Sequence, residues 1–152
     1  GKNNQLPWEE PLPDDLKHFR EEIKGKPIIM GWNTWMSVLQ ARGGPFPDST
    51  NIILAKDDIS EIEGCVVAHS LEKAVSLAGD APEVGIIGGA SVYEQFITKA
   101  HVMRLTEVKA EVAGGDAFFP EFGDEWREIE RIHHDKDNNH MYEFDFVTYE
   151  RI

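Results

Sequence analysis

The sequence predicts an α/β fold: a central, mostly parallel mixed β-sheet with flanking helices and an antiparallel C-terminal hairpin. The first observation is a set of short apolar, β-branched runs typical of buried parallel strands, at 27–30, 51–54 and 84–87, with a fourth candidate at 65–68. The second is a set of helical patterns that alternate with these runs, at 14–23, 33–39, 71–78 and 91–99. Such alternation is typical of βαβ units and therefore of a parallel sheet.

The pattern changes after residue 101, where strand-like segments follow one another. They cover 101–108, 126–133 and 142–149, and a polar turn at 135–139 joins the last two. We expect them to be antiparallel additions to the parallel sheet. Neither a linker nor an internal repeat interrupts the chain, so we expect one domain over residues 1–152.

Composition excludes several classes of protein. The 152 residues carry a formal net charge of −13, with the acids spread along the chain, whereas nucleic-acid binding depends on clustered Lys and Arg. Cys65 is the single cysteine, which excludes an intrachain disulfide and a cysteine-based metal site. Neither a membrane-spanning apolar run nor a signal peptide is visible. We therefore expect a cytoplasmic globular protein that binds neither nucleic acid nor a membrane.

The helix expected at 14–23 places a carboxylate on its apolar side. Pro13 suits the first helical position, and the helix dipole accounts for Asp14 in the first turn. The dipole explains Asp15 less well, because Asp15 lies four residues before Phe19 and shares a face with it. A carboxylate among apolar neighbours is costly unless it is paired or functional, so Asp15 is a candidate catalytic residue.

Two strand-to-helix junctions are candidate anion sites. Gly88-Gly89 follows the strand expected at 84–87 and precedes a helix, and Gly31 to Thr34 form a similar junction. Backbone N–H groups at a helix N-terminus bind phosphate readily. A Gly-Gly turn alone is a weak signal, but together with an acid in apolar surroundings it suggests proton and hydride chemistry on a small heterocycle.

Nine motifs follow one another along the chain. They are Leu6-Pro7-Trp8, 12–16, 27–31, Thr34-Trp35, 45–47, 51–54, 87–96, Leu105-Thr106 and 115–120. In this order and spacing they resemble bacterial-type dihydrofolate reductase over essentially the whole chain. The resemblance implies NADPH-dependent reduction of 7,8-dihydrofolate to 5,6,7,8-tetrahydrofolate, with hydride to C6 and a proton to N5, in one-carbon metabolism. It also implies a monomer that antifolates such as methotrexate or trimethoprim would inhibit.

The resemblance assigns the pterin side of the site. Asp15 would bind the pteridine amino group and a ring nitrogen, and would support protonation at N5. Thr106 would orient this carboxylate, and Trp8 would pack over the site and hold a water linked to it. The implied substrate contacts are Leu6, Asp15, Phe19, Arg20, Val38 and Thr106. The apolar members also suit ordinary core packing, because a pocket wall is part of the core.

The resemblance also assigns a cofactor site. The Gly88-Gly89 peptide would be cis, and Tyr93 would lie beside the nicotinamide as a catalytic residue. The implied NADPH contacts are Gly31, Trp32, Asn33, Thr34, Leu54, Lys56, Ile87, Gly88, Gly89, Ala90, Ser91, Val92 and Tyr93.

The sequence departs from the family pattern at two anion clamps. Trp32 stands where the family has an arginine for the cofactor 2′-phosphate; Lys56 is the best replacement charge and Arg42 a weaker one. Ser49 stands where the family has an arginine for the folate α-carboxylate, and a serine cannot form the same two-pronged contact. Arg20 would compensate in part.

Two further expectations concern the ends of the chain. The family has a hydrophobic first strand before the loop that begins here at Gly1; this strand is missing, so we expect a trimmed sequence. Residues 1–11 match the mobile loop over the nicotinamide, extended here by residues 9–11. The six histidines have no metal-ligand spacing, so no metal site is predicted, and His133, His134 and His140 are expected to be solvated near the last hairpin.

Two other functions remain as alternatives. A reductase of another pterin or pyrimidine is favoured slightly by Ser49, and opposed by Asp15, Trp8 and Thr106 together. A non-catalytic folate- or nucleotide-binding module would have lost its anion clamps, but Asp15 and the Gly-Gly turn are retained.

Overall fold

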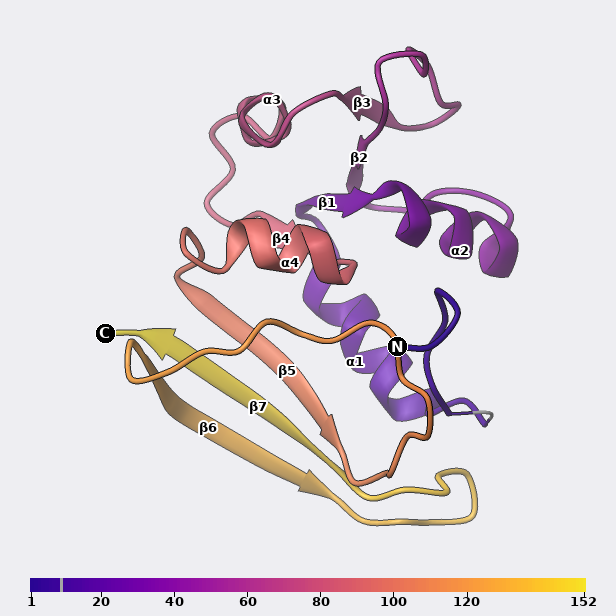
Figure 1. The fold of residues 1–152 in the computed structure, drawn as a ribbon, viewed down its shortest axis with the longest axis vertical. Coiled ribbons are helices and arrows are strands. Elements are labelled where there is room, and N and C mark those ends of the chain that lie inside the picture. Colours follow the sequence, from indigo (N-terminus) through magenta and orange to yellow (C-terminus); the bar gives the residue numbers. More distant parts are fainter. Residues whose placement is uncertain (9) are drawn as a thin grey trace. The chain divides into compact units, whose positions relative to one another are not determined.

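Helices and strands alternate through most of the first two thirds of the chain in the computed structural model, which describes residues 1–8 and 10–152 (Figure 1). The exception is β3, which follows β2 with no helix between them. In chain order the elements are α1 (Pro13–Ile23), β1 (Pro27–Gly31), α2 (Trp32–Arg42), β2 (Thr50–Leu54), β3 (Val66–Ala68), α3 (Leu71–Leu77), β4 (Gly85–Ile86), α4 (Ala90–Phe96), β5 (Val102–Val108), β6 (Trp126–His134) and β7 (Phe144–Arg151). The chain divides into two compact units, residues 1–19 with 97–152 and residues 20–96, each with its own sheet. One domain over residues 1–152 stays a prediction.

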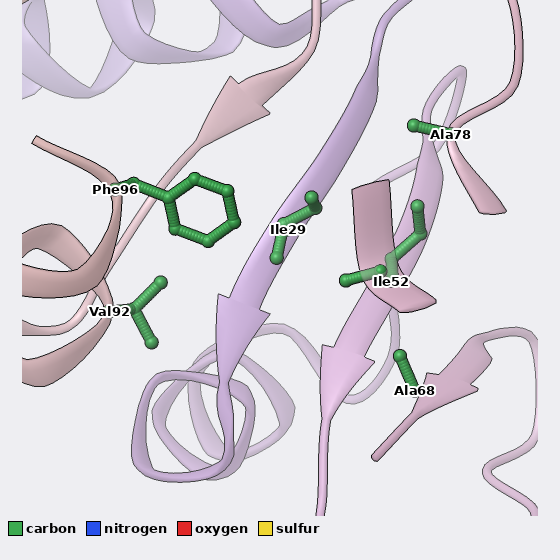
Figure 2. Packing of buried hydrophobic residues seen from close by; sticks show 7 residues of the cluster. Ile29, Ile52, Ala68, Ala78, Val92 and Phe96 are labelled. Atoms are coloured by element: carbon green, nitrogen blue, oxygen red, sulfur yellow. The ribbon is translucent and has the colours of Figure 1, made fainter. Parts of the chain in front are cut away.

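The unit of residues 20–96 contains a parallel sheet in the order β3-β2-β1-β4. Its two inner strands are apolar on both faces, as expected where helices cover a parallel sheet. Ile29 of β1 and Ile52 of β2 lie opposite each other and are fully buried. Val92 and Phe96 of α4 pack against this cluster (Figure 2). Burial of each large side chain contributes about 1.5–3 kcal/mol, so this cluster holds α4 on the sheet.

The unit of residues 1–19 and 97–152 contains an antiparallel sheet in the order β5-β7-β6. The α/β fold class is confirmed, with its parallel sheet, helices and antiparallel C-terminal hairpin. One detail of the prediction is wrong: the antiparallel strands form a sheet of their own instead of extending the parallel one. Strand β7 is the middle strand of this sheet, because it pairs along one edge with β5 and along the other with β6.

Several element boundaries also differ from the prediction, among them those of α4 and β4. Helix α4 ends at Phe96 rather than at residue 99, because the β-branched residues Ile97 and Thr98 favour helix poorly. The β4 ladder covers Gly85–Ile86 only, because the chain turns at Gly88, where φ is +116°. Of the helices that the structure describes, none is long and apolar enough to span a membrane.

Candidate functional site

Asp15 and Thr106 form a hydrogen-bonded pair. Asp15 is half-buried in the first turn of α1, and Thr106 is half-buried in β5. The Thr106 hydroxyl donates to Oδ1 of Asp15 at 2.7 Å, across 91 residues of sequence. Two residues predicted for the same site therefore meet within one unit. A carboxylate accepts several hydrogen bonds, so Asp15 keeps the capacity to accept from a ligand while Thr106 fixes its orientation.

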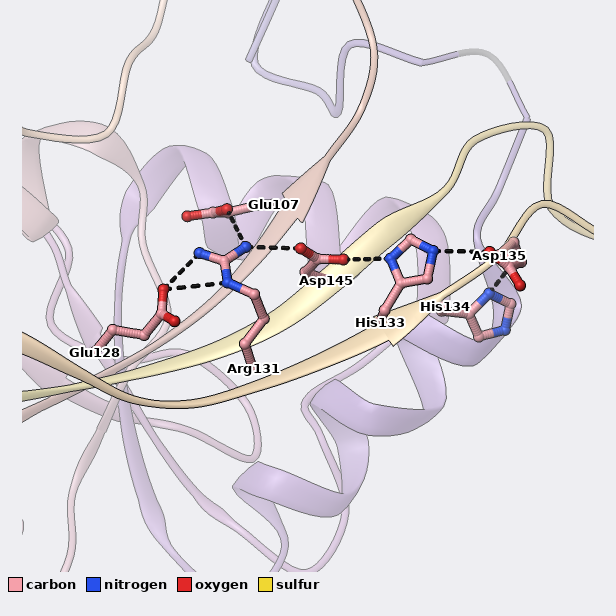
Figure 3. A network of polar contacts seen from close by, with 7 residues as sticks. All are labelled: Glu107, Glu128, Arg131, His133, His134, Asp135 and Asp145. Carbon is pink, nitrogen blue, oxygen red and sulfur yellow. Dashed lines mark hydrogen bonds and ion pairs between the residues drawn. The ribbon is translucent and has the colours of Figure 1, made fainter.

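A network of charged side chains joins the three strands of the sheet that carries Thr106 (Figure 3). The Arg131 guanidinium contacts Glu107 at 2.8 Å and Asp145 at 2.7 Å, and Asp145 contacts Nδ1 of His133 at 2.6 Å. Glu107, His133 and Asp145 occupy one row across the strands. The hydrogen bond from Arg131 lowers the pKa of Glu107, and the bond to Asp145 raises the pKa of His133. These contacts fix β5 immediately next to Thr106.

His140 corrects the prediction that the hairpin histidines are solvated. Its side chain is only 1% exposed, and its Nε2 accepts a hydrogen bond from the Asp14 backbone N–H at 3.1 Å. Because the first N–H groups of a helix have no partner within the helix, His140 caps α1 from 126 residues away. His134 is partly buried and stacks on Phe144, with ring centroids 4.4 Å apart. Of the three histidines, His133 comes nearest to the expected solvated state, since its side chain is 49% exposed.

The other predicted pterin contacts are distributed over both units. Phe19 is half-buried like Asp15 one turn before it, Trp8 is half-buried, and Leu6 is 61% exposed. Arg20 is exposed in α1, and Val38 is half-buried in α2; both belong to the unit of residues 20–96. Their roles as substrate contacts stay predictions.

The predicted loop at residues 1–11 bonds to the segment around residue 116. The backbone N–H groups of Asp116 and Ala117 donate to the Gly1 carbonyl at 3.0 and 3.2 Å. The Asn3 N–H donates to a carboxylate oxygen of Asp116 at 3.1 Å. Glu9, in the predicted extension of this loop, lies outside the described residues. A role for this loop as a lid stays a prediction.

The predicted cofactor residues gather at the carboxyl edge of the parallel sheet. Gly31, Leu54 and Ala68 lie in register at the ends of β1, β2 and β3. The Gly31 N–H donates to the Gly88 carbonyl at 2.8 Å, which joins the two glycine junctions predicted from the sequence. Strand order reverses between β1 and β4, and ligands of open α/β sheets bind outside the carboxyl ends of strands at such a reversal.

The helices at this edge carry no carboxylate in their first turns. Helices α1 and α3 begin with acidic residues, and Ser70 caps α3 through the Lys73 N–H, whereas α2 and α4 begin with none. Among the described residues no side chain caps α2, whose cap residue is Gly31. In a chain with a net charge of −13, this edge is therefore arranged to accept an anion such as a dinucleotide phosphate.

Gly88 gives the chain its close turn beside Tyr93. Gly88 has φ +116°, and the Gly88-Gly89 peptide is cis, as the resemblance implies. A Cβ at Gly88 would lie 3.2 Å from the Tyr93 ring, and one at Gly89 would lie 3.4 Å from Thr34 Oγ1. Burial raises the pKa of Tyr93 to about 12. The other predicted contacts on these two junctions are Trp32, Asn33, Ile87, Ala90, Ser91 and Val92, of which Val92 is buried.

The residues at the two altered anion clamps have other contacts. The Ser49 hydroxyl donates to the Ile23 carbonyl at 2.9 Å. The Arg42 guanidinium lies 4.8 Å from the centre of the Phe46 ring, and its role as a replacement charge stays a prediction. Trp32 is 36% exposed, and Lys56 is exposed just after β2 at the carboxyl edge.

The comparisons agree with this geometry. The family model of dihydrofolate reductase matches residues 1–151. A type 3 dihydrofolate reductase of Salmonella typhimurium is 37% identical over 99% of this chain and 90% of its own length. The dihydrofolate reductase HdrB of Haloferax volcanii is 38% identical over 99% of this chain and 76% of its own length. A solved dihydrofolate reductase from Enterococcus faecalis, complexed with NADP(H) and RAB-propyl, matches with a TM-score of 0.83 and 30% identity over 99% of this chain and 88% of its own. The chain belongs to the dihydrofolate reductase family.

Proposed function

We propose that this protein reduces 7,8-dihydrofolate to 5,6,7,8-tetrahydrofolate with NADPH. The observation that carries the proposal is the hydrogen bond from Thr106 to Asp15, in a chain whose relatives are dihydrofolate reductases. Among the described residues no side chain caps the start of α2, its first turn holds no acidic residue, and with the close turn at Gly88 these features fit a dinucleotide. When bound, NADPH supplies the hydride that reaches C6 of the substrate.

The residues of this chain hold the substrate and support the proton transfer. Asp15 accepts hydrogen bonds from the pterin amino group and a ring nitrogen, which fixes the ring and favours protonation at N5. Thr106 keeps the Asp15 carboxylate in one orientation. A spectrophotometric assay with dihydrofolate and NADPH tests the proposal.

Each alternative predicts a different result in this assay. A higher kcat/KM for a pterin without a benzoylglutamate tail would favour another reductase. Dihydrofolate that raises the melting temperature without any oxidation of NADPH would identify a non-catalytic binding module. We expect the assay to give turnover with dihydrofolate, and an antifolate to compete for the Asp15 carboxylate. A monomeric state and a cytoplasmic location stay predictions.

Thr106→Val is expected to lower kcat/KM for dihydrofolate by about 10- to 100-fold, because a hydrogen bond to a charged group contributes about 1.5–3 kcal/mol. Valine has nearly the same shape as threonine, so the melting temperature should change little. Thr148→Val is the control, since Thr148 is half-buried in β7 of the same sheet. Equal kinetic losses in the two variants would contradict a role for the Thr106 hydroxyl.

Lys56→Ala is expected to reduce the ratio of kcat/KM for NADPH over NADH. Lys56 is the exposed charge just past β2, and Trp32 at the neighbouring junction carries none. A lysine binds the 2′-phosphate as a point charge, so the preference of the wild type should be modest and should shrink at high ionic strength. Lys73→Ala, an exposed change on α3, serves as the control. A strong NADPH preference that survives Lys56→Ala would place the charge elsewhere.

A further inference from the structure

A second cluster of polar side chains lies at the start of α1, and the proposed reaction uses none of them. Asp14 is in the first turn of α1, His134 ends β6, and Asp137 and His140 follow in the loop toward β7. Each offers one ligand atom, and these atoms lie within 4.8 Å of one another. All four residues belong to the unit of residues 1–19 and 97–152.

Two separations within the cluster are close to those between the ligand atoms of a small metal ion. His134 Nε2 lies 2.8 Å from Asp14 Oδ2 and 3.8 Å from Asp137 Oδ2. A tetrahedral Zn²⁺ site with metal–ligand distances of about 2.0–2.1 Å separates its ligand atoms by about 3.3 Å. The two separations from His134 Nε2 each lie within about half an ångström of that value.

The ring of His134 is held as metal-binding imidazoles are held. Its Nδ1 bonds to the Asp135 backbone carbonyl at 2.7 Å (Figure 3), which turns Nε2 toward the carboxylates. Stacking on Phe144, with an angle of 10° between the rings, fixes the plane of the ring. A backbone carbonyl on the second ring nitrogen is a usual partner of a metal-ligating histidine, because it fixes the tautomer and orients the free nitrogen.

His140 positions both carboxylates. Its Nδ1 bonds to Asp137 Oδ1 at 2.7 Å, and the Asn139 N–H donates to the same oxygen at 2.8 Å, so Asp137 presents Oδ2 to His134. His140 Nε2 accepts from the Asp14 backbone N–H. With its side chain only 1% exposed, His140 is a rigid support for the two aspartates rather than a ligand.

We propose that His134, Asp14 and Asp137 bind a divalent transition-metal cation, with His140 as the residue that orients the carboxylates. One imidazole nitrogen with two carboxylate oxygens suits Zn²⁺ better than Ca²⁺ or Mg²⁺, which prefer oxygen ligands throughout. Two carboxylates and a neutral imidazole balance the charge of the ion. The ion would tie the β6–β7 loop to the first turn of α1, so its role would be structural.

The test uses the metal-free, tag-free chain. Isothermal titration calorimetry measures the binding of Zn²⁺, and visible absorption reports the geometry of Co²⁺ bound in place of Zn²⁺. We expect one tight equivalent with the ligand-field bands of a tetrahedral ion, and a higher melting temperature with Zn²⁺ present. His134→Gln and Asp14→Asn should each weaken binding by about tenfold or more. Neither measurement uses turnover, so the result is independent of the proposed reductase activity.

The control is His133→Gln, one residue from His134 but part of a separate cluster with Asp135 and Glu143. His133→Gln should leave Zn²⁺ affinity unchanged. Absence of a tight equivalent in the wild type, or equal losses in the His133 and His134 variants, would overturn the proposal and leave the cluster as a hydrogen-bonded brace. If the His134 variant fails to fold, NMR of the wild type decides: Zn²⁺ must shift the ring signals of His134 and leave those of His133 in place.

Discussion

Asp15→Asn is expected to lower kcat for dihydrofolate at pH 7 by about two to four orders of magnitude, the usual contribution of a positioned acid–base group. The amide keeps the size of the side chain and still offers an oxygen to the Thr106 hydroxyl, which donates to Oδ1 in the wild type. The fold should therefore survive. What the amide lacks is the negative charge that holds the pterin and favours protonation at N5.

The pH profile separates this role from a purely structural one. In Asp15→Asn, activity should recover in part as the pH falls, because solvent can then protonate the substrate. Glu21→Gln is the matched control, an exposed carboxylate-to-amide change on the same helix, and it should keep wild-type kinetics. Unchanged turnover of Asp15→Asn at pH 7 would remove Asp15 from the catalytic role.

The parallel sheet was predicted from local sequence pattern, whereas the Asp15–Thr106 pair was predicted from the family resemblance. Strands β1 and β2 are runs of buried aliphatic residues, a signal that needs no partner to be recognised. The pairing of Asp15 with Thr106 crosses 91 residues, and spacing alone does not predict it. It followed from the resemblance of both flanking motifs to one family.

The histidine cluster could not be predicted from local pattern. His140 lies in a polar turn, where solvation is the usual expectation, and its burial depends on a helix start 126 residues away. The ion pairs of Arg131 could not be predicted from local pattern either, because Glu107 and Asp145 reach it from two other strands. His134, Asp137 and His140 are three residues apart each time, but this spacing indicates no metal site until the turn brings the three residues to Asp14.

Gly88→Ala is expected to weaken NADPH binding by about tenfold or more, since small displacements at a positioning site carry large costs. Gly88 has φ +116°, a conformation that L-residues rarely adopt, and an added Cβ would lie 3.2 Å from the Tyr93 ring. The Gly88 carbonyl also accepts the Gly31 N–H, so a shift at Gly88 would disturb both junctions at the carboxyl edge. The strain should also lower the free energy of unfolding, by about 1–3 kcal/mol.

Gly79→Ala separates the loss of stability from the loss of cofactor affinity. Gly79 has φ +68°, and a Cβ there would meet nothing within 4 Å, so this variant bears backbone strain away from the predicted cofactor edge. Both variants should melt at lower temperature than the wild type, but only Gly88→Ala should raise the Kd for NADPH, measured by fluorescence titration. An unchanged Kd in Gly88→Ala would mean that the dinucleotide does not approach this turn. A raised Kd in both variants would trace the effect to general destabilisation, because Gly79 follows α3 and has no part in the glycine junctions.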